Sequence, residues 1–118
     1  MRAHPSLLPV LGLMLATTAC ALPAQREAAP GGNERIEGSI ASIDTQPWSY
    51  DGHAVVEVDV PGRGRVPVQL PARWNLCQAA AVDVQSLAVG MHVQAVGALE
   101  DDGAITICAD RAHQLVPR

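Results

Sequence analysis

The chain has 118 residues, with 8 basic side chains (all arginine) against 12 acidic ones, and a formal net charge of -4. A chain of this length is expected to form one small domain. Hydrophobic residues make up 48% and charged residues 17%, which excludes the charge-rich composition of a disordered tail. The acidic balance argues against a nucleic-acid partner, because such proteins draw affinity from neutralising phosphates. The chain contains no Phe, so we expect an aliphatic core.

Residues 1–19 predict a secretory signal peptide. Arg2 gives the segment a positive start, residues 7–19 carry no charge, and small residues surround Cys20. This order of features is typical of a leader that is removed on export. The uncharged run is shorter than the roughly 20 residues that a membrane-spanning helix needs. We therefore expect the mature protein outside the cytosol.

The residues Thr17-Thr18-Ala19-Cys20 resemble the lipobox of bacterial lipoproteins, whose cysteine becomes a lipidated N-terminus. The resemblance implies a lipid anchor on Cys20. Since Ala21, and not aspartate, follows it, the resemblance also implies the outer membrane, facing the periplasm. The alternative is ordinary cleavage after Ala21 or Ala24. Residues 20–34 are rich in Ala, Pro and Gly without an apolar period, which predicts the lipidated cysteine followed by a flexible linker or a frayed tail.

From Arg35 onward, apolar residues alternate with polar ones, as in half-buried β-strands. The first strand contains Ile36, Gly38 and Ile40, and a change of phase before Ile43 predicts a β-bulge. A turn-rich loop follows at residues 48–52. The next two strands are joined by a hairpin, and their apolar positions are Val56, Val58, Val60, Val66, Val68 and Leu70.

The second half of the chain predicts a short helix and two more strands. Residues 71–81 break the alternation, and Pro71 at the start with alanines at the end favours a helical turn or short helix. A fourth strand follows at residues 93–99, and Asp102-Gly103 predicts a hairpin. The last strand contains Ile105 and Ile107 and is a candidate to resume at residues 115–116. An all-β fold follows: a five-stranded Greek-key barrel with one short helix between strands three and four.

Three features together resemble the OB-fold: Gly38 in the first strand, the helical segment, and the pattern Leu87-x-x-Gly90-x-x-Val93-x-Ala95-x-Gly97. The resemblance covers about residues 35–116 and implies an OB-like barrel domain over residues 35–118. Gly97 would permit the tight coiling that a small barrel needs. Residues 70–77 (LPARWNLC) are similar to a block in small uncharacterised bacterial periplasmic proteins, a likeness that carries no activity.

Three cysteines are present. If Cys20 is acylated, Cys77 and Cys108 remain as a pair, and in an oxidising compartment we expect a disulfide. The bond would close a loop of about 31 residues, worth roughly 3–4 kcal/mol on the chain-entropy model. It would tie the predicted helix to the fifth strand at the base of the barrel, with Trp74 beside it.

Two other uses of these cysteines are less favoured. Zinc binding by Cys77, Cys108, His53 and His113 lacks a closely spaced ligand pair. A nucleophilic Cys77 relayed by His113 lacks a neighbour that would lower the pKa of the thiol. We expect no metal site and no cofactor.

OB-folds usually bind ligands through the face of strands two and three and the loops that follow strands one and four. The resemblance places these loops at residues 44–52 and 100–103. The first contains Trp48 and Tyr50, which are suited to stacking on a ligand, and Arg73 is the third candidate binding residue. The alternative for the two rings is that they fold back over the end of the barrel. Residues 100–103, with three consecutive acids, predict a solvated hairpin tip or, alternatively, a cation site.

No nucleophile elbow, phosphate loop or His-Glu metal helix is present, so an enzyme is not expected. The favoured hypothesis is a membrane-anchored periplasmic adaptor that binds a protein, peptide or envelope component through the loop that carries Trp48 and Tyr50. The alternatives are a small-molecule or cation receptor that uses residues 100–103, and an exported enzyme centred on Cys77. Nucleic acid is not expected, because Glu57 and Asp59 add negative charge to the open face.

Overall fold

The computed structural model describes Gly12 and residues 32–118. The predicted lipid anchor Cys20 lies outside the described residues, as do the signal peptide, apart from Gly12, and almost all of the linker. Among the described residues, no helix has the length and apolar character needed to cross a membrane.

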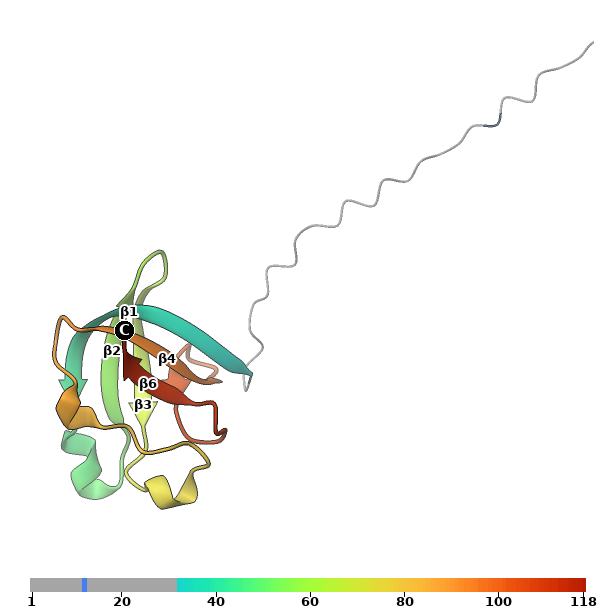
Figure 1. The fold of residues 1–118 in the computed structure, drawn as a ribbon. Coiled ribbons are helices and arrows are strands. Elements are labelled where there is room, and N and C mark those ends of the chain that lie inside the picture. The colour runs from blue at the N-terminus through green and yellow to red at the C-terminus, as the bar shows by residue number, and fades with distance from the viewer. Residues whose placement is uncertain (1–11, 13–31) are drawn as a thin grey trace, which may run out of the picture.

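The regular secondary structure consists mainly of strands, and three short 3-10 turns lie between them (Figure 1). The strands are β1 (Asn33–Asp44), β2 (Ala54–Val60), β3 (Gly64–Leu70), β4 (His92–Leu99), β5 (Ile105–Thr106) and β6 (Gln114–Pro117). The 3-10 turns are η1 (Gln46–Tyr50), η2 (Trp74–Leu76) and η3 (Val84–Ser86).

The strands close into a barrel. The order β1-β2-β3-β5-β4 returns to its start because β4 also pairs with β1. Only the β3–β5 pair is parallel, and the other pairs are antiparallel. The result is a closed five-stranded mixed barrel, compatible with an OB-like fold. The predicted all-β class is confirmed.

The fifth strand of the barrel is built in two pieces. Residues 93–96 of β4 pair with β1 along one edge and with β6 along the other. The following residues of β4, Ala98 and Leu99, pair with β5, so β5 and β6 lie one after the other along the same edge. The predicted resumption of the last strand at residues 115–116 is confirmed.

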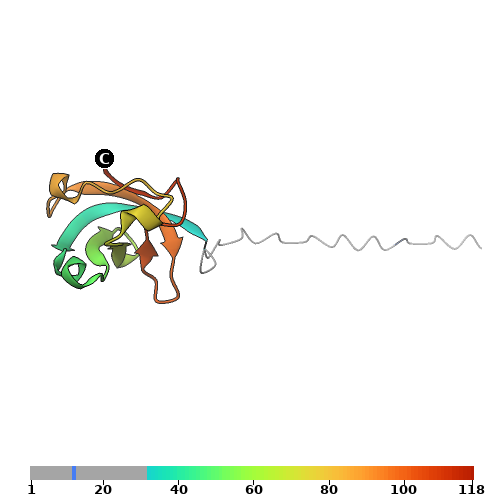
Figure 2. The same cartoon turned by 90° about the horizontal axis from the view of Figure 1, so that it is seen from below.

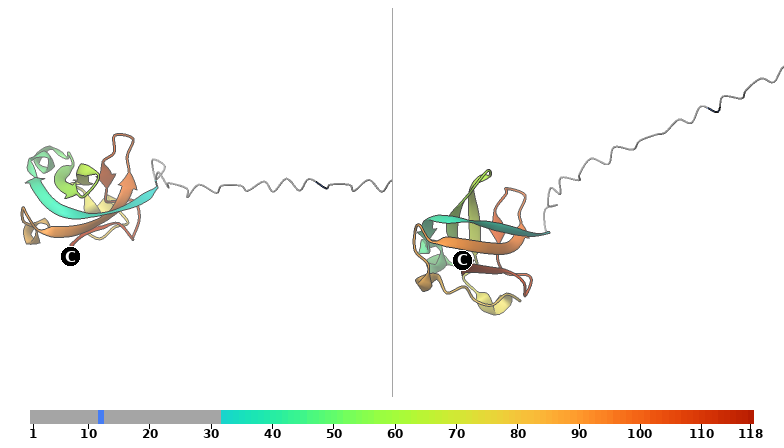
Figure 3. Two further views of the ribbon diagram at one scale, coloured as in Figure 1. Left: turned by 90° about the horizontal axis from the view of Figure 1, so that it is seen from above. Right: turned by 45° about the horizontal axis from the view of Figure 1, so that its top comes forward.

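Strand β1 is long because it pairs with two different strands, one along each half of its length. Its first half pairs with β4 and its second half with β2, and the register shifts between Ile40 and Ser42, which confirms the predicted bulge. Figure 3 shows β1 curving across the barrel with β4 alongside it. The strand begins at Asn33, two residues before the predicted start, because Asn33 pairs with Ala98 and Glu34 with Gly97. The last two residues assigned to the linker therefore belong to the barrel.

The core is aliphatic, as the composition predicted. Every second residue of the longer strands points inward, which is the alternation expected of a small barrel. Side chains that are almost fully buried include Ile36, Ile40, Val56, Val58, Val66, Val68, Leu70, Val93, Ala95, Ile105, Ile107 and Leu115. Trp48 and Trp74 are half-buried and pack against this cluster.

Of the helical turn or short helix predicted over residues 71–81, the structure forms the helical turn only. The segment contains only η2, which ends where the backbone of Cys77 becomes extended. The amides of Gln78 and Ala79 then both donate to the carbonyl of Cys108, at 2.9 and 3.0 Å. These bonds fix the chain after Cys77 to Cys108, which lies between β5 and β6, so the local preference of the alanines for a helix is overridden.

Candidate functional site

The two aromatic residues of the first predicted binding loop have different environments. The indole Nε1 of Trp48 donates a hydrogen bond to the carbonyl of Leu70 at 3.0 Å, and its ring packs on the core. Tyr50, two residues later, is 73% exposed. Trp48 therefore covers the end of the barrel, and only Tyr50 is presented to solvent.

Local hydrogen bonds shape the loop that carries Tyr50. The side chain of Asp44 accepts from the amide of Gln46 at 3.0 Å, and Pro47 fixes the backbone at the start of η1. The turn ends at Asp51, whose φ of 63° is left-handed, a conformation that Asp adopts more readily than most residues. Tyr50 is thus the last residue of a turn whose backbone is fixed by Pro47 at its start and by Asp51 at its end.

Arg73 joins this loop to η2. Its Nη2 lies 2.8 Å from Oδ2 of Asp51, and its Nε lies 3.5 Å from Oδ1. The hydrogen bond from Arg73, and then its charge, lower the pKa of the Asp51 carboxyl. The ion pair is exposed and contributes little to stability. Its effect is geometric, because it connects the η1 and η2 turns at one end of the barrel (Figure 1).

Sequence reasoning did not single out Leu76, which is 72% exposed in η2. Its amide donates to the carbonyl of Arg73 at 3.1 Å, so its backbone lies one turn from the ion pair. We use the name Tyr50–Leu76 surface for Tyr50, Asp51, Arg73 and Leu76. Because alternation stops at residue 71, no sequence period indicated which way Leu76 would point.

The outer face of β2 and β3 is polar. Arg65 lies 3.1 Å from Asp59 and 3.5 Å from Glu57, so one guanidinium pairs with two carboxylates. Beside them, the hydroxyl of Thr106 donates to Gln69 Oε1 at 3.0 Å. This face contains no aromatic residue, so stacking on it, as in nucleic-acid-binding barrels, has no platform.

The acidic loop forms the predicted hairpin. The amide of Gly103 donates to the carbonyl of Glu100 at 3.0 Å, that of Glu100 donates to Ala104 at 2.8 Å, and Asp102 Oδ1 accepts from the amide of Ala104. Within residues 32–118, no group of three or more His, Cys, Asp or Glu side chains is arranged to hold a metal ion. In Figure 2 the hairpin projects away from η1, so the two predicted binding loops do not meet.

Cys77 and Cys108 form the predicted disulfide, with sulfur atoms 2.07 Å apart. The bond joins Cys77, directly after η2, to Cys108, two residues after the end of β5. The half-buried Trp74 lies in η2, three residues before Cys77. Both sulfur atoms are thereby committed, and neither is a free zinc ligand or nucleophile in this state.

His113, the other residue of the alternative zinc and catalytic hypotheses, is a buried structural residue. It is 2% exposed, its Nδ1 accepts from the amide of Cys108 at 3.1 Å, and its Nε2 lies 2.7 Å from Oδ1 of Asn33. Since a backbone amide always donates, Nδ1 must carry the lone pair and Nε2 the hydrogen. Both ring nitrogens are therefore occupied.

The same network continues to Asp110. Asn33 Nδ2 donates to Asp110 Oδ2 at 3.2 Å, and the amide of Ala112 donates to Oδ1 at 2.8 Å. The bond from Ala112, followed by that from Asn33, lowers the pKa of the Asp110 carboxyl. The network thus holds the first residue of β1 against the turn that precedes β6.

No family model and no curated protein matches this chain. Its function is therefore argued from its own residues, and the Tyr50–Leu76 surface is where the structure gathers most of the residues predicted to bind a partner.

Replacing His113 with alanine should lower the free energy of unfolding by about 2–3 kcal/mol, because a buried donor loses its acceptor. Urea denaturation followed by circular dichroism measures the change. His92→Ala is the matched control: His92 is exposed, so its loss should change stability by less than about 0.5 kcal/mol. Equal effects for the two variants would contradict the structural role of His113.

Proposed function

We propose that this protein is a non-enzymatic binding module that recognises a protein or peptide of the cell envelope through the Tyr50–Leu76 surface. One observation carries the proposal: two large apolar side chains, each more than 70% exposed, project from turns that an Arg–Asp pair connects. Tyr and Arg are enriched at protein interfaces, and a tyrosine supplies a large contact area at a low cost in conformational entropy.

The proposal includes a periplasmic, membrane-anchored location. The support is the lipobox-like sequence at residues 17–20 together with the Cys77–Cys108 disulfide, a bond that persists in oxidising compartments. With Cys20 lipidated, residues 21–32 would separate the outer membrane from the barrel. The chain would then present its binding surface near the membrane without inserting into it.

The electrostatics favour a protein partner over nucleic acid. The net charge is -4, and on the outer face of β2 and β3 the single cation Arg65 is already paired with Glu57 and Asp59. Phosphates would meet repulsion on this face, where phosphate contacts would have to supply the affinity. A protein surface with apolar pockets fits Tyr50 and Leu76 better, since Arg73 is itself already paired with Asp51.

Photo-crosslinking in intact cells tests the proposal. A photoreactive amino acid at position 50 should give a discrete adduct, whereas the same group at Pro61, in the hairpin at the other end of the β2–β3 pair, should not. Leu76→Ala should reduce the position-50 adduct at least fivefold by removing buried contact area. Val89→Ala, which shortens another exposed apolar residue, should leave its yield unchanged.

Two results would contradict the proposal. One is an identical adduct pattern from positions 50 and 61, which would indicate random encounter. The other is a loss of folded structure in Tyr50→Ala, which would show that the ring supports the barrel. Thermal stabilisation of the protein by millimolar Ca²⁺ that is abolished by Asp101→Asn would instead favour the cation receptor.

A further inference from the structure

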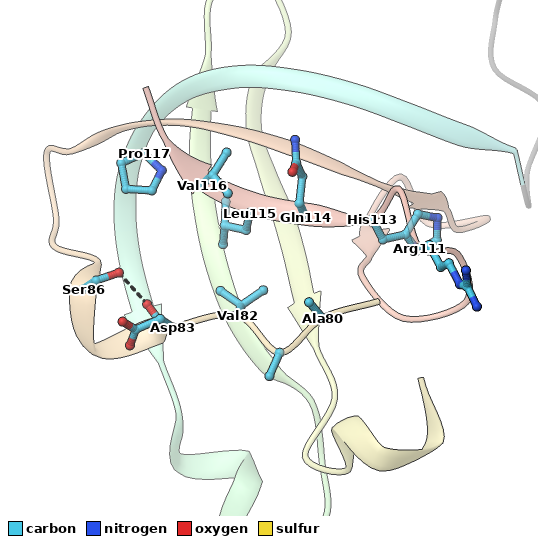
Figure 4. Close-up of a pocket in the computed structure, with 11 residues that line it drawn as sticks. Ala80, Val82, Asp83, Ser86, Arg111, His113, Gln114, Leu115, Val116 and Pro117 are labelled. Carbon is cyan, nitrogen blue, oxygen red and sulfur yellow. Dashed lines mark hydrogen bonds between the residues drawn. The ribbon is translucent and has the colours of Figure 1, made fainter. Parts of the chain in front are cut away.

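A pocket separate from the Tyr50–Leu76 surface lies beside β6. It has a volume of about 340 Å³ and is formed between residues 80–86 on one wall and β6 with the preceding turn on the other. Figure 4 shows Val82 and Leu115 near its middle, Arg111 at one end and Asp83 at the opposite end. This volume lies within the range of ordinary ligand pockets.

The β6 wall is an open strand edge. The amide of Arg118 donates to the carbonyl of His92 at 2.9 Å, which turns that residue toward β4. Main-chain groups alternate along an antiparallel strand, so Val116 and Gln114 also face β4 and Leu115 faces away from it. The amide and carbonyl of Leu115 therefore point to the side on which no described strand pairs with β6.

The opposite wall also lacks main-chain partners. Among the described residues, the amides and carbonyls of Ala80 and Ala81 make no backbone hydrogen bond. Ala80 and Ala81 are exposed, whereas Leu115 is only 4% exposed, and buried main-chain groups nearly always find partners. The two walls thus offer hydrogen-bonding groups that an inserted polypeptide strand would satisfy from both sides.

The ends of the pocket have opposite charge. Arg111 and Asp83 both line it, and neither has an ion-pair partner within the described part of the chain. β6 runs from the Arg111 end toward the Asp83 end (Figure 4). A strand that runs antiparallel to β6 would start beside Asp83 and finish beside Arg111, so a basic group at its start and an acidic group at its end would complement the pocket.

We propose that this pocket binds a short extended peptide segment by strand addition to β6, with a basic residue near Asp83, small apolar residues against Val82, and an acidic residue near Arg111. At about 3.4 Å per residue, β6 and His113 match a segment of about five residues. Strand addition takes affinity from main-chain bonds and specificity from alternate side chains. The site is independent of the proposed function, because no residue of the Tyr50–Leu76 surface lines it.

The pocket favours a free segment over a second copy of the barrel. Residues 80–83 line the pocket on the side opposite β6 (Figure 4). A strand within a folded sheet would bring its neighbours with it and collide with this wall. Only a segment without flanking strands fits between the walls.

Fluorescence anisotropy with labelled peptide pools tests the proposal on the full-length chain. One pool has Lys at position 1, Asp or Glu at position 5 and random Ala, Val, Thr or Ser between them; the other reverses the charges. We expect the first pool to bind at least tenfold more tightly. Arg111→Glu combined with Asp83→Arg should invert this preference, whereas Arg35→Glu, an exposed arginine outside the pocket, should not change it.

A second measurement reports the main-chain bonds directly. Amide hydrogen exchange at Leu115 should slow at least tenfold when the first pool is bound, because strand addition covers that amide. Pools with an N-methylated residue at position 3 should lose both the binding and the protection. Tyr50→Ala should change neither, which separates this site from the proposed function.

The proposal is overturned if neither pool binds at about 1 mM, a concentration at which even weak complexes form. It is also overturned if binding survives N-methylation with Leu115 unprotected. Concentration-dependent dimerisation that protects Leu115 without peptide would likewise overturn it, because a second copy would then occupy the edge.

Discussion

Alanine in place of Gly38 should destabilise the barrel by about 3 kcal/mol or more, at the upper end of the usual cost of overpacking. A Cβ at this position would overlap with the carbonyl oxygen of Asp59 and lie 2.8 Å from its carbon. Both are main-chain atoms of β2. Gly38 pairs with Val93 on β4, and Ser39 pairs with Asp59 on β2. Strand β1 is therefore hydrogen-bonded on both sides near Gly38 and cannot easily move away from β2 to make room for a methyl group.

Thermal and urea unfolding of the Gly38→Ala chain measure this effect. Ser39→Ala is the control in the same strand: its side chain is exposed, and we expect a change within about 0.5 kcal/mol. An unchanged melting temperature in Gly38→Ala would mean that β1 and β2 separate easily there, and the close crossing of the two strands would be wrong.

Removal of the disulfide has the second large effect. The Cys77→Ser, Cys108→Ser double variant should lose about 3–4 kcal/mol, because the bond closes a loop of 31 positions that restricts the unfolded chain. For a domain of this size, the loss corresponds to a fall in melting temperature of roughly 15–25 °C. The native strand pairing should remain, because neither cysteine lies in a strand.

Intact mass with and without reductant establishes the bond, and calorimetry of the oxidised and reduced chain measures its contribution. Cys20→Ser is the matched control and should leave the melting temperature unchanged, since Cys20 takes no part in the bond. Equal melting temperatures before and after reduction would show that the disulfide does not stabilise the barrel by reducing the conformational entropy of the unfolded chain.

Much of the fold was predictable because its signals are local. Alternation located the strands, the change of phase before Ile43 located the bulge, and the turn residues located both hairpins. Gly38 was singled out by the resemblance to the OB-fold and Gly97 as a position of tight coiling, and a Cβ on either would press on neighbouring main-chain atoms. The predicted helical segment is limited to the η2 turn, because Gln78 and Ala79 are bonded to Cys108, a residue outside the local sequence.

The candidate site was only partly predictable, because exposure depends on tertiary contacts. Sequence reasoning selected Trp48 and Tyr50 as a pair, but the carbonyl of Leu70 holds Trp48 against the barrel end and leaves Tyr50 free. The sequence did not indicate that Leu76 would be exposed, because outside an alternating run nothing predicts whether an apolar side chain faces the core or the solvent. The Asn33–His113 contact joins residues 80 positions apart, which no local pattern indicates.

The pairing of β1 with β4 also determines when the chain can fold. Asn33 lies opposite Ala98, so the first half of β1 gains its neighbour only after most of the sequence has been synthesised. Barrels dominated by such distant pairings fold in milliseconds to seconds. A nascent chain of this kind cannot close its barrel until β4 has left the ribosome, because the first half of β1 has no other strand neighbour in the barrel.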